Sequence, residues 1–245
     1  MAYTTINKSD DYFNTKLYTS TGATQSITGV GFQPDLIWIK SRSQGQLHCL
    51  FNSSHIGEFL SSNITGASDT SAGGVTSYNT DGFSIGTLGG INNGTNPHVA
   101  WNWLANGAGS ANTAGSTNTV VSANTTSGFS IVTYSGNSTA GSTFGHGLGV
   151  KPSMIITKAR TRASMWNVYH KGLTNYTKGI YLNTTDAEFA GGAFQDGEPN
   201  TTTFTLSNGT HVNGSGETYV AYCFAEKQGY SKFGSYTGNG NANGT

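Results

Sequence analysis

The side chains that most often carry catalysis or bind metals are few and scattered in this chain of 245 residues. Its six histidines share no metal-ligand spacing with one another, with a cysteine or with a carboxylate. Cys49 and Cys223 are too few for a zinc cluster or a disulfide framework. The sequence therefore predicts no metal site and no cofactor. The histidines are His48, His55, His98, His146, His170 and His211.

Two loops carry side-chain oxygens that could hold calcium. Residues 79–82 are Asn-Thr-Asp-Gly and residues 195–198 are Gln-Asp-Gly-Glu. A dedicated calcium loop supplies more carboxylates than either of these. Asn, Asp and Gly are also typical turn residues, because they tolerate the backbone angles that turns require. We interpret both loops as turns.

No arrangement of residues typical of an enzyme is found. Glycoside hydrolysis needs two carboxyl groups on facing strands, one of them with a raised pKa. The acidic residues fall mostly in turns, and none recurs as a pair in the repeat described below. The chain also lacks a nucleophile elbow, a P-loop and a dinucleotide-binding fingerprint. The sequence predicts a protein that is not an enzyme.

Aromatic residues two positions apart offer a different chemistry, the stacking of sugar rings. Trp101 and Trp103 share one side of a predicted strand and could form such a platform. The matching positions later in the chain, Tyr222 and Phe224, are equally bulky. Packing in a core explains both pairs, and we favour that interpretation. Trp38, whose later counterpart is aliphatic, is assigned to the core for the same reason.

Two basic pairs also recur, Lys40 with Arg42 and Lys158 with Arg160. Such a pair at a strand end could bind a carboxylate or an acidic glycan. It could equally be a solvated strand end that discourages pairing with another sheet edge. We favour the second interpretation, and the sequence assigns no receptor-binding residue.

The elements that would position these side chains form a long repeat. Residues 31–42 are matched by residues 149–160 at an offset of 118, with the Pro, Lys and Arg positions retained. Residues 98–103 are matched by residues 219–224 at an offset of 121. Self-similarity over this length predicts two copies of one unit. A third copy begins near residue 233, and the sequence stops at residue 245.

Alternation of apolar and polar residues predicts short strands in both copies, for example at residues 36–40 and 98–103. Large apolar side chains fall on the same face of these strands in each copy, so we expect that face to be interior. The predicted fold is all-β, with two tandem β-sandwich repeats of jelly-roll-like form joined by a Gly-, Ser- and Asn-rich linker. The expected core residues are Pro34, Trp38, Phe83, Val99, Trp101, Trp103, Pro152, Phe204, Val220, Tyr222 and Phe224.

The repeat sets the expected domain boundaries. The first sandwich is predicted over residues 1–105, the linker over residues 106–118 and the second sandwich over residues 119–232. Residues 233–245 are expected to form the opening strand of a truncated third repeat. Because the linker is small, uncharged and rich in glycine, we expect the two sandwiches to be separable there by proteolysis.

Composition narrows the classes of partner. The 12 basic and 12 acidic residues give a formal net charge of zero, whereas nucleic-acid binding needs a clustered basic excess. An aromatic content of 11% argues against intrinsic disorder. No apolar stretch is long enough to cross a bilayer, and the first residues carry no secretory signal. We expect a chain made in a cytoplasm, with no nucleic-acid partner and no membrane insertion.

The repeated sequence also resembles a known group of proteins. The run of residues 31–42, the Asp-Gly-Phe-Ser-Ile-Gly of residues 81–86 and residues 216–240 are similar to a repeat domain of marine bacteriophage, cyanophage-type, tail fibres and related virion structural proteins. The similarity extends from Asp11 onward and is most specific over residues 216–240. The resemblance implies no catalytic residues.

The resemblance implies a virion protein that is made in the host cytoplasm and released by lysis. It implies other virion proteins as partners, a homotrimer, and a host-surface glycan or protein as receptor, bound through several weak contacts. A tail fibre or tail-associated protein in host recognition is the first expectation. A capsid-decorating or connecting protein without a receptor role is the alternative, and a carbohydrate-active depolymerase is the least favoured.

Overall fold

The computed structural model describes residues 4–70 and 72–242, and the regular structure in that part of the chain is nearly all β. This confirms the predicted all-β class. The helical elements described are the 3-10 turn η1 (Ser9–Asp11) and α1 (Thr210–Asn213), and neither has the length or apolar character needed to cross a bilayer. The strands are β1 (Phe13–Thr19), β2 (Gln25–Thr28), β3 (Leu36–Ser41), β4 (Cys49–Asn52), β5 (Leu60–Ser61), β6 (Val75–Asn79), β7 (Gly82–Ile85), β8 (Pro97–Trp103), β9 (Ser110–Asn112), β10 (Thr119–Asn124), β11 (Phe129–Ser135), β12 (Ser142–Gly145), β13 (Met154–Ala159), β14 (Asn167–His170), β15 (Lys178–Tyr181), β16 (Phe189–Ala190), β17 (Thr203–Leu206) and β18 (Thr218–Phe224).

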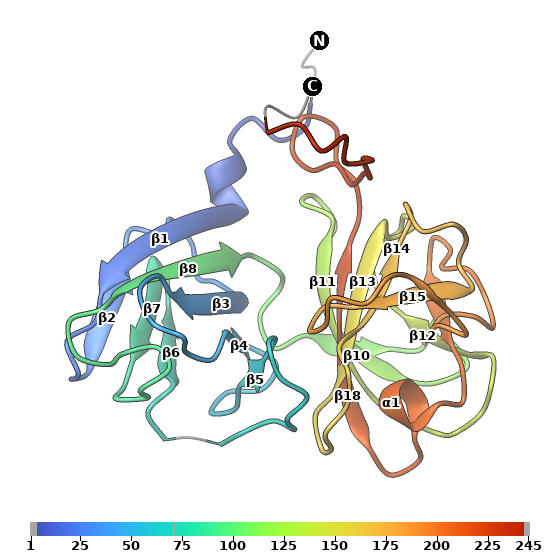
Figure 1. The fold of residues 1–245 in the computed structure, drawn as a ribbon, viewed down its shortest axis with the longest axis horizontal. Helices are drawn as coiled ribbons and strands as arrows, with labels where there is room; N and C mark the ends of the chain where they lie inside the picture. Colours follow the sequence, from blue (N-terminus) through green and yellow to red (C-terminus); the bar gives the residue numbers. More distant parts are fainter. Residues whose placement is uncertain (1–3, 71, 243–245) are drawn as a thin grey trace.

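Each half of the chain builds one large and one small antiparallel sheet (Figure 1). In the first half, residues 4–105, the large sheet has the strand order β1-β8-β3-β4-β5. The same order recurs in the second half, residues 106–225, as β11-β18-β13-β14-β15, with β10 and β9 added at one edge and β16 at the other. The small sheets are β2-β7-β6 and β12-β17. The strand order therefore follows the repeat of the sequence.

Each half also has its own core, formed between its large and its small sheet. In the first half, Ile37 and Ile39 of β3 are buried together with Phe83 of β7. In the second half, Ile155 of β13 is buried together with Phe204 of β17. These clusters are β-sandwich-like, because the inner faces of two sheets supply the buried side chains.

A third buried cluster lies between the two halves, and it corrects the predicted interior face. Leu36 and Leu50 of the first large sheet are buried here against Ile156, Val220 and Tyr222 of the second. The face with the largest apolar side chains thus packs against the other half, whereas the opposite face lines each half's own core. Alternation shows that a strand has two different faces. Both faces of these sheets carry buried apolar side chains, so alternation alone does not identify which face lines the half's own core and which meets the other half.

Burial of the expected core residues varies accordingly. Phe83 and Phe204 lie in the separate cores, and Val220 and Tyr222 lie between the halves. Four of the expected residues keep part of their surface exposed: Trp38, Trp101, Trp103 and Phe224. Pro34, Val99 and Pro152 are buried.

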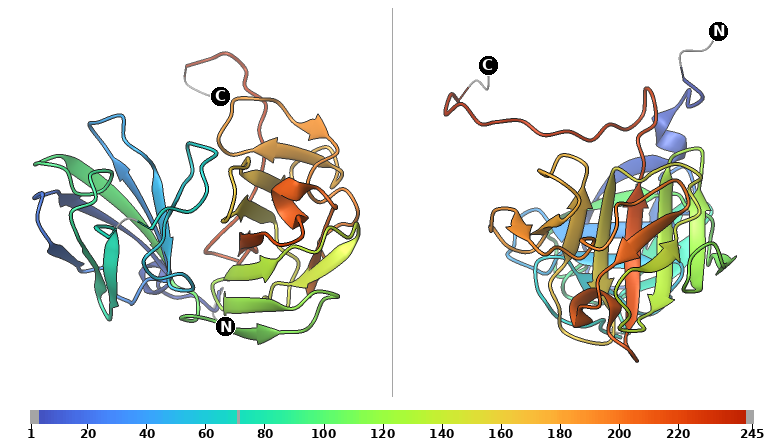
Figure 2. Two further views of the ribbon diagram at one scale, coloured as in Figure 1. Left: turned by 90° about the horizontal axis from the view of Figure 1, so that it is seen from below. Right: turned by 90° about the vertical axis from the view of Figure 1, so that its right-hand side faces the viewer.

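The segment predicted as a flexible linker, residues 106–118, is instead bound along its length. Its β9 pairs with β10 in the large sheet. A Cβ on Gly115 would lie 2.2 Å from the Thr143 carbonyl oxygen, so this glycine permits a close backbone approach. The glycine content predicts flexibility, but Gly115 instead permits tight packing. The left view of Figure 2 shows the two halves side by side.

The opening strand expected for a third repeat does not form in residues 233–242, and residues 243–245 lie outside the described part of the chain. In the first two copies the opening strands β1 and β11 pair with the closing strands β8 and β18 of the same copy. The described residues hold no further closing strand that could pair with residues 233–242. Phe233 contacts the rings of Phe224 and His170 instead.

Candidate functional site

The other half of the molecule covers only part of the large first sheet. Leu36, Leu50 and Leu60 are buried between the halves, whereas Leu17 on the edge strand β1 is 57% exposed. Between these limits lie the partly exposed Trp38 of β3 and Trp101 of β8. On this face of the sheet, the tryptophans thus lie at the boundary between the part covered by the other half and the part exposed to solvent.

The pairing of β3 with β8 brings the two tryptophans together. Trp38 lies directly opposite Trp101, and their ring centroids are 6.0 Å apart with the planes at 72°. Trp103, two residues further along β8, is on the same face and contacts Phe13 of β1 at a centroid distance of 4.8 Å. In the Trp38–Trp101 pair the edge of one ring contacts the face of the other, an arrangement that aromatic rings prefer.

A hollow of about 390 Å³ opens over these rings and is lined by Trp38, Lys40, His48, Trp101 and Trp103. We call it the cationic hollow. Lys40 Nζ donates one hydrogen bond, to the Ser41 carbonyl oxygen at 3.5 Å. No acidic side chain lines this hollow, and none of the ion pairs found among the described residues involves Lys40.

His48 lies beside Lys40. In the pairing of β3 with β4, Ile39 is opposite Cys49, and continuing that register by one residue places His48 opposite Lys40. Burial lowers the pKa of His48, and the nearby charge of Lys40 lowers it further. At neutral pH the imidazole is therefore uncharged and can either donate or accept a hydrogen bond in the hollow.

A second hollow of about 460 Å³ lies where the two halves meet and shares Trp38 and Trp103 with the first. Trp103 contacts Phe129 and Phe224 of the second half at centroid distances of 6.2 and 6.3 Å. We call the two hollows together the aromatic groove. Its remaining lining is Ser9, Phe13, Ser127, Gly128, Met154, Ile156, Ala225, Tyr230, Ser231 and Phe233.

In the second half, the positions that correspond to the cationic hollow are closed. Lys158, the counterpart of Lys40, is fully buried, and its Nζ donates to the carbonyl oxygens of Ala159 at 2.8 Å and Arg162 at 3.4 Å and to Ser164 Oγ at 3.3 Å. Trp166, the counterpart of His48, is also fully buried. The corresponding face of the large sheet is thus open in the first copy and filled in the second.

The closed site is filled by a loop of the first half. Trp166 Nε1 donates to the carbonyl oxygens of Ser61 at 3.0 Å and Ile64 at 3.2 Å. The Ser68 amide donates to the Arg160 carbonyl at 2.7 Å, and the Arg160 side chain pairs with Glu58. Arg160 therefore joins the two halves rather than forming the solvated strand end expected from the sequence.

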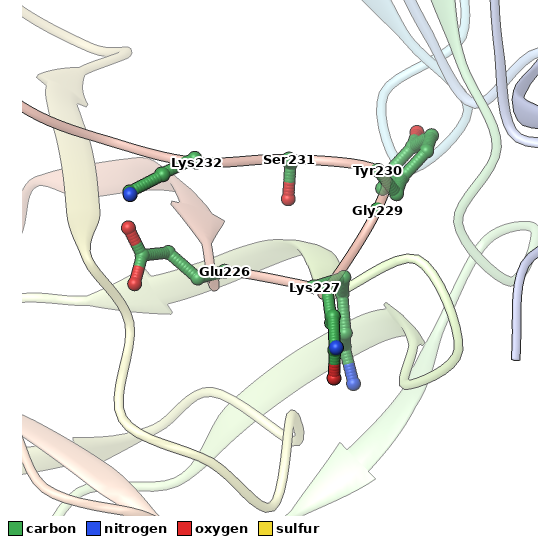
Figure 3. Close-up of a pocket in the computed structure, with 7 residues that line it drawn as sticks. Glu226, Lys227, Gly229, Tyr230, Ser231 and Lys232 are labelled. Atoms are coloured by element: carbon green, nitrogen blue, oxygen red, sulfur yellow. The ribbon is translucent and has the colours of Figure 1, made fainter. Parts of the chain in front are cut away.

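Another hollow of about 500 Å³ lies within a single turn, residues 226–232 (Figure 3). Glu226 and Lys232 point toward one another in it, and Glu226 also pairs with Lys171. Tyr230 of this turn contacts the ring of Tyr12 near the N-terminus at 6.2 Å. A single turn lines this hollow, and its Glu226 is already paired, so we interpret it as a structural turn that packs on Tyr12 rather than as a binding site.

The remaining candidates from the sequence have structural partners. Asp81, in one of the two oxygen-rich loops, accepts hydrogen bonds from the amides of Gly29 and Gly31, which lower the pKa of its carboxyl. Glu198, in the other, pairs with Lys151. No group of three or more metal-ligating side chains occurs in residues 4–70 and 72–242.

The two cysteines are also placed by the structure. Cys49 and Cys223 are both buried and unpaired, one in each core. Burial raises the pKa of each thiol to about 12, so both are protonated at neutral pH and are poor nucleophiles.

The sequence pairs Trp101 with Trp103 but gives no reason to join Trp38 or Lys40 to them in one site. His48 stands out in the sequence only as one of six histidines without metal-ligand spacing, with no role in a site. The signal for His48 is the offset of 118, which aligns it with a tryptophan of the second copy and so marks a position where the two copies differ in bulk.

A family model described as a domain of unknown function (DUF7483) matches residues 8–245. No curated protein and no solved structure matches the chain.

Proposed function

The chain belongs to the DUF7483 family, and we propose that it is a non-enzymatic bacteriophage virion protein, a tail fibre or tail-associated protein that contributes to recognition of the host surface. The aromatic groove is the surface we assign to that recognition. The resemblance of the repeat to cyanophage-type tail fibres supports the virion part of this proposal, and the chemistry of the groove supports the recognition part.

The single observation that carries the recognition role is the open pair of Trp38 and Trp101 beside Lys40. Exposed indole faces next to a cation bind ligands by stacking and by charge-assisted hydrogen bonds. The lining described for the groove contains no aspartate or glutamate. Such a surface can bind a ligand, but it offers no carboxyl pair for hydrolysis.

The fold suits a fibre or its attachments. We propose that the two halves are tandem β-sandwich repeats of one jelly-roll-like unit, which the recurrence of the five-strand order supports. A homotrimer would bring several grooves to the same surface, so that weak contacts would add up to firm attachment.

Antibody labelling of purified virions tests the proposal. Antibodies raised against the chain should mark the tail or its fibres in electron micrographs. Labelling of the head instead would favour the second candidate, a capsid-decorating protein, which the exposed Leu17 on the open sheet face also supports as a contact for another virion protein. Absence of the chain from virions would overturn both candidates.

A further inference from the structure

The two copies of the repeat provide an internal comparison for the cationic hollow. An ammonium group has three hydrogen-bond donors. In the second copy Lys158 directs them to three oxygen atoms of its own half. In the first copy Lys40 retains only the bond to the carbonyl of the following residue, at 3.5 Å. Two of the three N–H donors of the Lys40 ammonium group thus make no hydrogen bond to the described protein groups. This ammonium group is a cation that lines an aromatic hollow.

The second difference between the copies is bulk. Trp166 fills its site and binds the loop of the other half that closes it. His48, at the same position in the first copy, is smaller and adds a polar ring nitrogen to the lining. The substitution leaves space beside Lys40 that the second copy does not have.

Trp101 supplies the stacking surface. It is partly exposed and, unlike Trp38 and Trp103, does not belong to the cluster buried between the halves. Its ring is held by Trp38 without being covered by the second half. An indole held in this way is suited to packing against the C–H face of a pyranose ring.

We propose that the cationic hollow is a subsite for a carboxylate-bearing sugar, such as a uronic acid residue of an acidic surface polysaccharide. The pyranose ring stacks on Trp101, and the carboxylate accepts hydrogen bonds from Lys40, while His48 contacts a hydroxyl group. Charge complementarity decides in favour of this ligand, because the hollow holds a cation without an acidic partner. The inference names a ligand class for the groove and in that respect rests on the proposed function.

The test is a binding titration followed by tryptophan fluorescence and calorimetry. The ligands are a β-1,4-linked oligomannuronate and the β-1,4-linked mannohexaose, which share the sugar backbone and differ in the carboxylate. We expect the wild-type chain to bind the acidic oligomer at least tenfold more tightly. Equal affinity for the two oligomers, or no binding of the acidic one, overturns the inference.

Variants locate the site. Lys40→Met should weaken oligomannuronate binding at least tenfold and leave mannohexaose binding unchanged, whereas Trp101→Ala should weaken both. Lys178→Met and Tyr236→Ala are the matched controls, because neither residue lines the groove. Trp101→Phe keeps an aromatic face and should restore part of the affinity. Full binding by Trp101→Ala, with the fold intact by thermal melting, would exclude this hollow.

Failure here is distinct from failure of the proposed function. If the chain labels virion tails and binds cells but ignores oligomannuronate, recognition stands and the acidic sugar is wrong. If it binds oligomannuronate through Lys40 but is absent from virions, the subsite stands and the virion role is wrong.

Discussion

Lys40 and Lys158 occupy the same position in two copies of one strand, yet Lys158 is enclosed by three oxygen acceptors and Lys40 opens into an aromatic hollow. The cause is the way the halves pack. A loop of the first half covers the site of the second through Trp166, whereas Lys40 and Trp101 remain on the open part of their sheet. The repeat therefore provides one structural lysine and one that is available to a ligand.

The buried lysine has a measurable effect on stability. Burial lowers the pKa of Lys158 to about 8 in the folded chain, whereas an unfolded lysine titrates near its ordinary value. Between these values the unfolded state binds the extra proton, so the contribution of Lys158 to the free energy of unfolding rises with pH. From pH 8 to pH 9.5 we expect the wild type to gain about 2 kcal/mol relative to Lys158→Met.

Urea unfolding at the two pH values measures this difference. Lys40→Met is the matched control, because its ammonium group remains within reach of water in the folded chain. If the difference in free energy of unfolding between the wild type and Lys158→Met is the same at both pH values, Lys158 stays charged in the folded chain over this range.

A histidine at the contact between the halves should make the chain sensitive to acid. Burial lowers the pKa of His55 to about 4, and the charge of Arg160 adds to this, while Glu58 acts in the opposite direction. Its Nδ1 is buried without a hydrogen-bond partner. The folded chain keeps His55 neutral while an unfolded histidine gains its proton near pH 6.5, so stability is lost as pH falls from about 6.5 toward 4.

His55→Gln should therefore lose less stability than the wild type between pH 7 and pH 5, by about 1 kcal/mol, as measured by urea unfolding. His211→Gln is the control, because His211 is exposed on α1. If both variants follow the pH profile of the wild type, His55 gains its proton in the folded chain as easily as in the unfolded one, and its pKa is not lowered by burial.

The connection between the halves should resist proteolysis. Residues 110–112 form β9, the Asn106 amide donates to Ser122 Oγ at 2.8 Å, and Ser53 Oγ donates to the Gly107 carbonyl at 2.9 Å. Elastase, which cleaves after small residues, should leave residues 106–118 intact in the wild type. Trp166→Ala removes a buried contact between the halves and should expose the segment. Release of two stable halves from the wild type would restore the flexible linker predicted from the sequence.

A single methyl group tests how closely this connection packs. In Gly115→Ala the new Cβ would meet the Thr143 carbonyl oxygen at 2.2 Å, next to the fully buried Phe144. We expect a loss of about 1 to 3 kcal/mol in the free energy of unfolding. Gly89→Ala is the control, because no atom lies within 4 Å of its added Cβ, and it should change stability by less than about 0.5 kcal/mol. Equal unfolding midpoints for the two variants would contradict the close approach.

The sequence allowed the strands to be predicted better than their surroundings. Alternation identified β3 and β8, because a side-chain period of two depends only on neighbouring residues. It could not show that the Leu36 side of β3 meets the other half, since that depends on how two sheets pack. Gly115 was misinterpreted because flexibility and close backbone approach both require a residue without a side chain.

The site was harder to predict than the fold. Trp38 and Trp101 meet through the register of β3 against β8, which no local pattern specifies. The role of His48 emerges only when Trp166 is seen to fill the corresponding place.

Binding of the purified chain to cells tests whether the aromatic groove takes part in host recognition, as we propose. Fluorescently labelled wild type and Trp101→Ala are incubated with a panel of marine cyanobacterial strains, and bound protein is measured against concentration. We expect saturable binding to some strains, reduced at least tenfold in affinity by Trp101→Ala and unchanged by Tyr236→Ala. Wild-type binding that is absent from every strain, or that Trp101→Ala leaves unaltered, would contradict a role for the aromatic groove in host recognition.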